Sequence, residues 1–123
     1  MIFYDFEVFK YDWLVVFIDL YAKRETVIIN DPDQLQQFYD QHKGVIWAGY
    51  NSRHYDQYIL KAILCGFNPK EVNDWIIIEE RPGYRFSSLL RNFPLINYDV
   101  MPNPPISLKT LEAFMGHSIK ETS

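Results

Sequence analysis

Two acidic residues near the N-terminus, Asp5 and Glu7, are spaced to act together on one divalent cation. They stand two residues apart in a segment of strand composition, and side chains along a strand alternate between its faces, so both carboxylates leave the same side. Two like charges this close repel each other and raise a pKa unless a cation compensates them, which favours a hard ion such as Mg²⁺ or Mn²⁺. The alternative is a solvated pair of acids at a strand end.

A third carboxylate, Asp56, ends the sequence GYNSRHYD, where a strand is expected to pass into a helix. At helical spacing Asp56 lies in line with Leu60 and Ile63, on or beside the apolar face. A carboxylate there is costly unless something pairs with it, and a metal ion shared with the two strand carboxylates would do so. The alternatives are a first-turn aspartate stabilised by the helix dipole and, for Asn51, a turn or N-cap residue.

The hydrophobic pattern predicts the elements that must position these side chains. Strands are expected at residues 2–7, 13–20, 25–29, 45–48 and 95–98. Helices are expected from a start within 30–33 to about 41, at 53–64, from 69 to near 78, and at 107–115. This order predicts an α/β domain whose mixed sheet starts with three antiparallel strands and is covered by helices.

The two acidic constellations together resemble the first two motifs of the DnaQ-like (DEDD) 3'-5' exonucleases. Asp5-Phe6-Glu7 is similar to the first motif, and Asn51 through Tyr55-Asp56 is similar to the second. The sequence around residues 4–9 is especially similar to the proofreading domains of phage-type DNA polymerases. The resemblance implies a ribonuclease-H-like fold and a single domain over 1–123.

The resemblance also implies a reaction and its residues. Catalysis and metal ligation would fall to three carboxylates, namely Asp5, Glu7 and Asp56. Contact with the substrate would fall to four neighbours, namely Phe6, Asn51, Tyr55 and Arg53. Two Mg²⁺ or Mn²⁺ ions, roughly 4 Å apart, would support hydrolysis of DNA from a single-stranded 3' end to nucleoside 5'-monophosphates. A polymerase domain in the same or an associated chain is the expected partner.

The family's third motif, an aspartate with a tyrosine or histidine that orients the attacking water, is absent from the 123 residues. No tyrosine is followed by an aspartate four residues later, and no histidine by one five residues later. Asp99, at an expected strand end, matches an aspartate that the family often has outside its catalytic four. We therefore expect a domain that continues beyond Ser123 and a fragment of uncertain activity. Two alternatives stay open: a non-catalytic nucleic-acid-binding or interaction module of the same fold, and a ribonuclease-H-like endonuclease.

Composition bounds these hypotheses. A chain of 123 residues that is 48% hydrophobic can bury one core, and its single cysteine, Cys65, excludes an internal disulfide. The net charge of -4 argues against binding nucleic acid by a broad basic surface, although bound metal ions would reverse the charge that a phosphate meets locally. No apolar stretch reaches the length of a membrane span, and we expect a cytoplasmic protein with no membrane partner.

Overall fold

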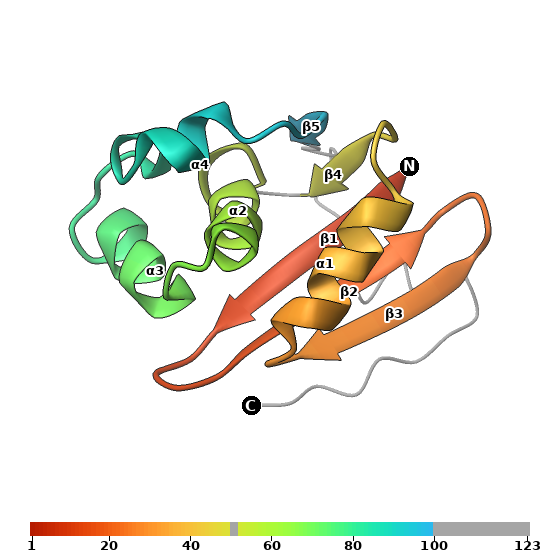
Figure 1. The fold of residues 1–123 in the computed structure, drawn as a ribbon, viewed down its shortest axis with the longest axis horizontal. Helices are drawn as coiled ribbons and strands as arrows, with labels where there is room; N and C mark the ends of the chain where they lie inside the picture. Colours follow the sequence, from red (N-terminus) through yellow and green to blue (C-terminus); the bar gives the residue numbers. More distant parts are fainter. Residues whose placement is uncertain (50–51, 100–123) are drawn as a thin grey trace, which may run out of the picture.

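The computed structural model describes residues 1–49 and 52–99, and this part of the chain is an α/β structure built on a five-stranded mixed sheet (Figure 1). The strands are β1 (Ile2–Val8), β2 (Trp13–Asp19), β3 (Arg24–Ile29), β4 (Trp47–Gly49) and β5 (Asn97–Asp99). The helices are α1 (Pro32–Gln41), α2 (Gln57–Cys65), α3 (Pro69–Ile77) and α4 (Ser88–Asn92). A π-helical turn, η1 (Ser52–Asp56), precedes α2, and a 3₁₀ turn, η2 (Gly83–Arg85), precedes α4.

The sheet has the strand order β3-β2-β1-β4-β5. Strands β1, β2 and β3 form an antiparallel meander, in which Asp5 lies opposite Val16 and Glu7 opposite Leu14. Strand β4 pairs parallel to β1 over only two residues, with Ile2 opposite Trp47, and β5 extends the sheet parallel to β4. The carboxyl half of β1 therefore runs past the end of β4, and its edge is open to other groups.

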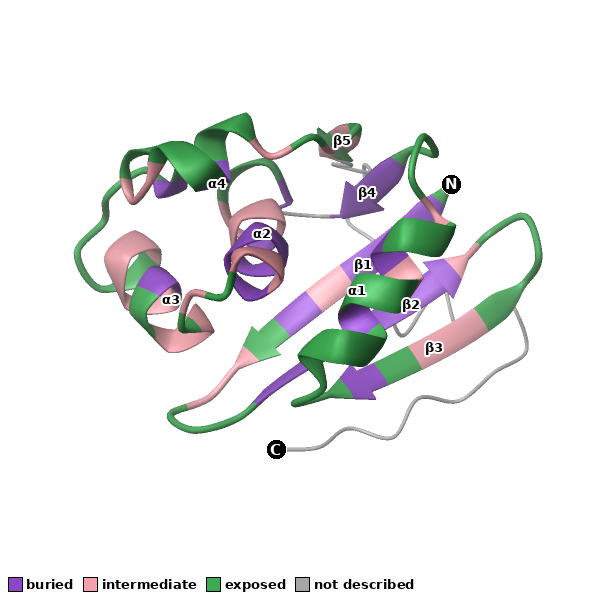
Figure 2. Cartoon of the chain, in the orientation of Figure 1, coloured by how far each residue is buried: buried purple, intermediate pink, exposed green. Residues whose placement is uncertain are grey.

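Helix α1 lies across the face of the meander, and α2 lies beside α1, joined to β1 and β4 through η1 (Figure 1). Beneath them is an aromatic core in which the Trp47 ring meets the rings of Tyr4, Phe17 and Tyr39. A second buried cluster occupies the opposite face of the sheet and consists of Phe3, Leu14, Val16, Ile18 and Ala48. Strand β2 is buried along nearly its whole length, as its continuous apolar sequence predicts (Figure 2).

Local sequence signals set the helix ends. The Asp31 carboxylate accepts a hydrogen bond from the Gln34 amide at 3.0 Å, with Pro32 at the first helical position of α1. The Asn68 side chain caps α3 in the same way, through the Lys70 amide at 2.8 Å. Gly66 ends α2 in the left-handed conformation, with φ of 86°, which a residue without Cβ adopts freely.

Most predicted elements are present, with three differences. The helix predicted at 53–64 begins as the π turn η1 and becomes α-helical only at Gln57. Helix α4 was not expected, because five residues are too few to show helical periodicity, although Ser87 caps it by accepting from the Leu89 amide. The strands predicted at 45–48 and 95–98 lie one or two residues later in the chain. The helix predicted at 107–115 lies outside the described residues, and a single domain over 1–123 stays a prediction.

Candidate active site

Strand β1 presents Asp5 and Glu7 on the face of the sheet opposite α1. Tyr4 and Phe6 point into the core beneath the helices, whereas Phe3 belongs to the cluster on the other face, and alternation puts both acids on that second face. Asp5 is half-buried and Glu7 is exposed. The shared face that the two-residue spacing predicts is therefore present, but the two carboxylates differ in solvation.

Asp56 reaches β1 from a position fifty residues later in the sequence. Its side chain is only 3% exposed, and Oδ1 accepts a hydrogen bond from the backbone N–H of Phe6 at 3.0 Å. Ile2 donates its N–H to Ile46 on the β4 side, so alternation directs the Phe6 N–H to the same edge, beyond the end of β4. The carboxylate thus occupies the place of a strand partner and satisfies a buried donor.

Asp56 makes no capping hydrogen bond to its own helix, although it stands at the N-cap position of α2. Asp56 therefore does not act as a hydrogen-bonding residue of the first turn of its own helix, because its Oδ1 atom accepts from the Phe6 N–H of β1 instead. Its burial agrees with the sequence-based placement on the apolar face, because Leu60 and Ile63 in the same stripe are also buried.

The π turn that delivers Asp56 is fixed by Asp99 at the end of β5. The Asp99 carboxylate accepts from the Arg53 N–H at 2.6 Å and lies 3.0 Å from the Ser52 hydroxyl. The same hydroxyl is within 3.3 Å of the Gly49 carbonyl and 3.0 Å of the Tyr98 carbonyl, so it donates to one of three acceptors at a time. These contacts tie η1 to the carboxyl ends of both parallel strands.

Gly49 allows this part of the chain to approach β1. A Cβ atom at Gly49 would stand 2.8 Å from the Tyr4 carbonyl oxygen and 3.2 Å from Ser52 Cβ. A side chain at this position would therefore push the end of β4 away from the strand that carries the acids.

The carboxylates interact electrostatically. Burial and, to a smaller extent, the charge of Glu7 together raise the pKa of Asp5 from 3.8 to about 6. The pKa of Asp56 is raised to about 7, chiefly by burial and then by the charge of Asp5, while the Phe6 hydrogen bond acts in the opposite direction. Asp99 adds a smaller upward effect on Asp56. The charges of Asp5 and Asp56 thus influence each other, and the charges of Glu7 and Asp99 add smaller effects on Asp5 and Asp56 respectively.

The residues predicted to touch a substrate occupy different environments. The Phe6 ring is buried in the core, packed against Tyr4 at 6.1 Å, so only its backbone reaches the site. Tyr55 is half-buried, its hydroxyl donates to Asn73, and burial followed by the charge of Asp56 raises its pKa. Arg53 is exposed. Asn51 lies outside the described residues.

Asp99 and Ser52 belong to this site, although the motif comparison placed Asp99 outside the catalytic residues and gave Ser52 no role. Ser52 is buried, and its hydroxyl and the Arg53 amide both contact Asp99. The available signal was the position of Asp99 at the end of a predicted strand, because the carboxyl ends of neighbouring parallel strands meet at one edge of a sheet. Ser52 carries no comparable signal, since serine is ordinary in a turn.

The donor chemistry fits a hard cation only in part. Asp5 and Asp56 are interacting carboxylates, the ligand type that Mg²⁺ and Mn²⁺ prefer. Within residues 1–49 and 52–99, however, no group of three or more histidine, cysteine, aspartate or glutamate side chains is arranged to hold a metal ion. Ligation of a cation by Asp5, Glu7 and Asp56 together stays a prediction.

Comparisons with known proteins do not assign the chain to a family. No protein-family model, curated protein or solved structure matches the chain. In the described part of the chain, none of the helices has the length and apolar character needed to cross a bilayer. A cytoplasmic location stays a prediction.

Proposed function

We propose that this chain is the catalytic portion of a metal-dependent 3'-5' exonuclease of the DnaQ-like type, with a ribonuclease-H-like fold. The observation that carries the proposal is the contact between Asp56 Oδ1 and the Phe6 N–H at 3.0 Å, which joins the two motifs across fifty residues. The antiparallel meander extended by two parallel strands supports the proposed fold, for which we expect a mixed sheet that starts with three antiparallel strands.

In this proposal Asp5 and Asp56 hold the divalent cation and Glu7 approaches from the solvent side. A bound cation would supply charge neutralisation at a phosphate and a more acidic water molecule. The chain's own part is to keep Asp56 fixed through the Phe6 N–H and to keep η1 in place through Asp99. Hydrolysis at the 3' end of single-stranded DNA would release nucleoside 5'-monophosphates, and a polymerase domain would supply or receive that strand.

A second candidate is a non-catalytic nucleic-acid-binding or interaction module of the same fold. Two observations favour it: Glu7 is exposed, and the described residues contain no three-ligand group. This module would bind nucleic acid without releasing mononucleotides. A metal-dependent endonuclease would use the same carboxylates but would cut within a strand.

The test compares Asp5→Ala with Asp33→Ala in the intact protein. Asp33 is an exposed first-turn residue of α1, so its loss removes a carboxylate without touching the site. With Mn²⁺ and end-labelled single-stranded DNA, we expect mononucleotide release by the wild type and by Asp33→Ala, and none by Asp5→Ala. Near wild-type release by Asp5→Ala would reject the assignment.

Circular single-stranded DNA separates the three candidates. An exonuclease leaves the circle intact and degrades the linear strand, whereas an endonuclease cuts both. Binding of the linear strand without any product, in the intact protein, would support the non-catalytic module.

A further inference from the structure

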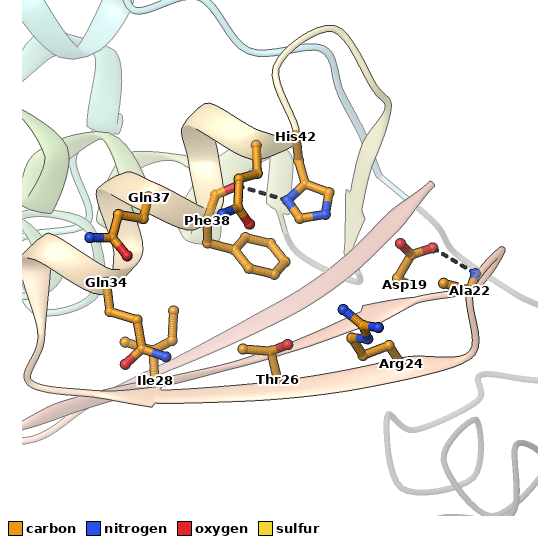
Figure 3. Close-up of a pocket in the computed structure, with 10 residues that line it drawn as sticks. Asp19, Ala22, Arg24, Thr26, Ile28, Gln34, Gln37, Phe38 and His42 are labelled. Atoms are coloured by element: carbon orange, nitrogen blue, oxygen red, sulfur yellow. Dashed lines mark hydrogen bonds between the residues drawn. The ribbon is translucent and has the colours of Figure 1, made fainter.

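A pocket of about 240 Å³ lies between helix α1 and the β2–β3 side of the sheet, and it shares no residue with the candidate active site. Figure 3 shows Phe38 of α1 and His42, which caps the end of that helix, facing Thr26 and Arg24 of β3 across it. Pockets for drug-sized ligands enclose roughly 300–1,000 Å³. This one is therefore suited to a single small ring system.

Three exposed glutamines line the helix side of the pocket. Gln34, Gln37 and Gln41 follow one another at intervals of three and four residues, so their amides form one stripe. Leu35 and Tyr39 form the buried stripe of the same helix. Among the described residues none of the three glutamine amides has a hydrogen-bond partner, and each is available as both donor and acceptor.

The sheet side supplies one charge of each sign. Asp19 and Arg24 are cross-strand partners, and Thr26 lies on the same face two residues along β3. The Asp19 Oδ1 atom accepts from the amides of Tyr21 at 3.0 Å and Ala22 at 3.1 Å, which fixes the carboxylate. Arg24 is exposed and forms no ion pair or hydrogen bond through its guanidinium within the described part of the chain.

The floor and one wall are apolar or aromatic. Ile28 is buried at the base, and the Phe38 ring stacks on the His42 ring with centroids 4.2 Å apart. His42 Nδ1 lies 2.7 Å from the Phe38 carbonyl, which can only accept, so Nδ1 carries the proton and Nε2 is left for another partner. The His42 ring is thus held in one orientation.

We propose that this pocket binds a nucleobase, with guanine as the best fit. The opposite charges of Asp19 and Arg24 balance, which disfavours a simple anion such as phosphate and favours a neutral ligand rich in donors and acceptors. Arginine pairs with the O6 and N7 acceptors of guanine. A carboxylate accepts from the guanine N1–H and amino group, and the glutamine amides and Thr26 hydroxyl complete the polar rim. The proposal does not rest on the exonuclease activity.

Amide chemical-shift titration of the intact protein tests the proposal. We expect deoxyguanosine to produce saturable shifts in residues 24–28 and 34–42, and deoxyadenosine to bind at least tenfold more weakly. Inorganic phosphate should give no saturable shift there. The trinucleotide d(TGT) distinguishes the two sources of the ligand: tighter binding than the nucleoside indicates a base within a strand, and weaker binding indicates a free nucleoside.

Substitutions in the pocket test whether deoxyguanosine binds there. Arg24→Leu should weaken deoxyguanosine binding at least tenfold, and Thr26→Val should weaken it less. Arg91→Leu is the matched control, because Arg91 is an exposed arginine of α4, outside this pocket. Undiminished binding to Arg24→Leu, phosphate binding as tight as deoxyguanosine binding, or no saturable shift with wild type would each overturn the proposal.

Discussion

A single oxygen of Asp56 serves both the fold and the candidate site. It accepts the Phe6 N–H that β4 is too short to pair, and it belongs to a carboxylate that interacts with Asp5. Burying a carboxylate is costly without compensation, and one hydrogen bond compensates only in part. The raised pKa of Asp56 reflects the remaining cost.

The pH dependence of stability should reveal that cost. The folded-state pKa of Asp56 is about 7 against 3.8 for an unperturbed aspartate, so the contribution of its protonated form is full below about pH 4 and is lost as the pH rises through 7. At about 1.4 kcal/mol per pH unit, the loss is up to roughly 4 kcal/mol. Asp56→Asn keeps an acceptor for Phe6 without the charge. We expect its unfolding free energy to exceed that of wild type at pH 8, with the difference shrinking towards pH 4.

Asp56→Ala is the control for that measurement. It removes both the charge and the acceptor, so it should be less stable than Asp56→Asn by about 1–3 kcal/mol, the cost of an unsatisfied buried N–H. Urea unfolding across the pH range measures both variants. A difference between wild type and Asp56→Asn that does not vary with pH would contradict the raised pKa.

Divalent cations should act on the same two carboxylates. If Asp5 and Asp56 hold a cation, Mn²⁺ at pH 7.5 should raise the midpoint of thermal unfolding in wild type, because a ligand that binds only the folded state stabilises it. The shift should be lost in Asp56→Asn and kept in Asp33→Asn, and differential scanning fluorimetry can measure it. An equal shift in all three proteins would show that Mn²⁺ binds elsewhere.

Elements, not single side chains, determine whether Asp56 reaches β1. The end of β4 must come close to Tyr4, and η1 must turn back on Asp99. Replacing Gly49 by alanine places a Cβ 2.8 Å from a backbone oxygen that cannot rotate away. We expect Gly49→Ala to lower the unfolding free energy by about 1–3 kcal/mol, the usual cost of overpacking.

The same variant should loosen the Asp56 contact. Displacement of β4 and η1 would lengthen the hydrogen bond to Phe6, so hydrogen exchange at the Phe6 amide should become faster than in wild type. Ala48→Gly serves as a neighbouring control, because it also alters β4 without adding an atom. Unchanged stability and unchanged Phe6 exchange in Gly49→Ala would show that the strand end tolerates a side chain.

Periodicity predicted the long elements and could not predict η1. The stripe of Tyr55, Ile59 and Ile63 correctly indicated a helix against the sheet, and that pattern is local. The π turn arises because Asp99 holds the start of the segment and β1 holds Asp56 at its end. Both contacts join residues about fifty positions apart, and no local pattern contains them.

At the scale of the whole molecule, the order of the elements predicted the class of fold. It could not predict how deeply each carboxylate of the candidate site is buried. Three apolar strands before the first helix indicated the antiparallel start of the sheet. The alternation along β1 correctly put Asp5 and Glu7 on one face. Glu7 is exposed and Asp56 is buried because neighbouring elements cover the two side chains differently. The spacing of residues in the sequence does not predict this difference.

The net charge of -4 leads to a prediction about how the protein binds DNA. The chain has sixteen acidic residues and only twelve lysines and arginines, so few basic side chains are available to contact phosphates. For single strands, the logarithm of the binding constant falls with the logarithm of the salt concentration, with a slope of about -0.7 for each phosphate contact. We expect a shallow slope for this protein, between about -1 and -2.

We also expect binding to weaken at least tenfold when EDTA removes divalent cations, because those ions would reverse the local charge. Fluorescence anisotropy of a labelled oligothymidylate at several salt concentrations measures both effects. A slope steeper than about -4, or binding indifferent to EDTA, would instead indicate a basic surface that holds the strand without metal ions.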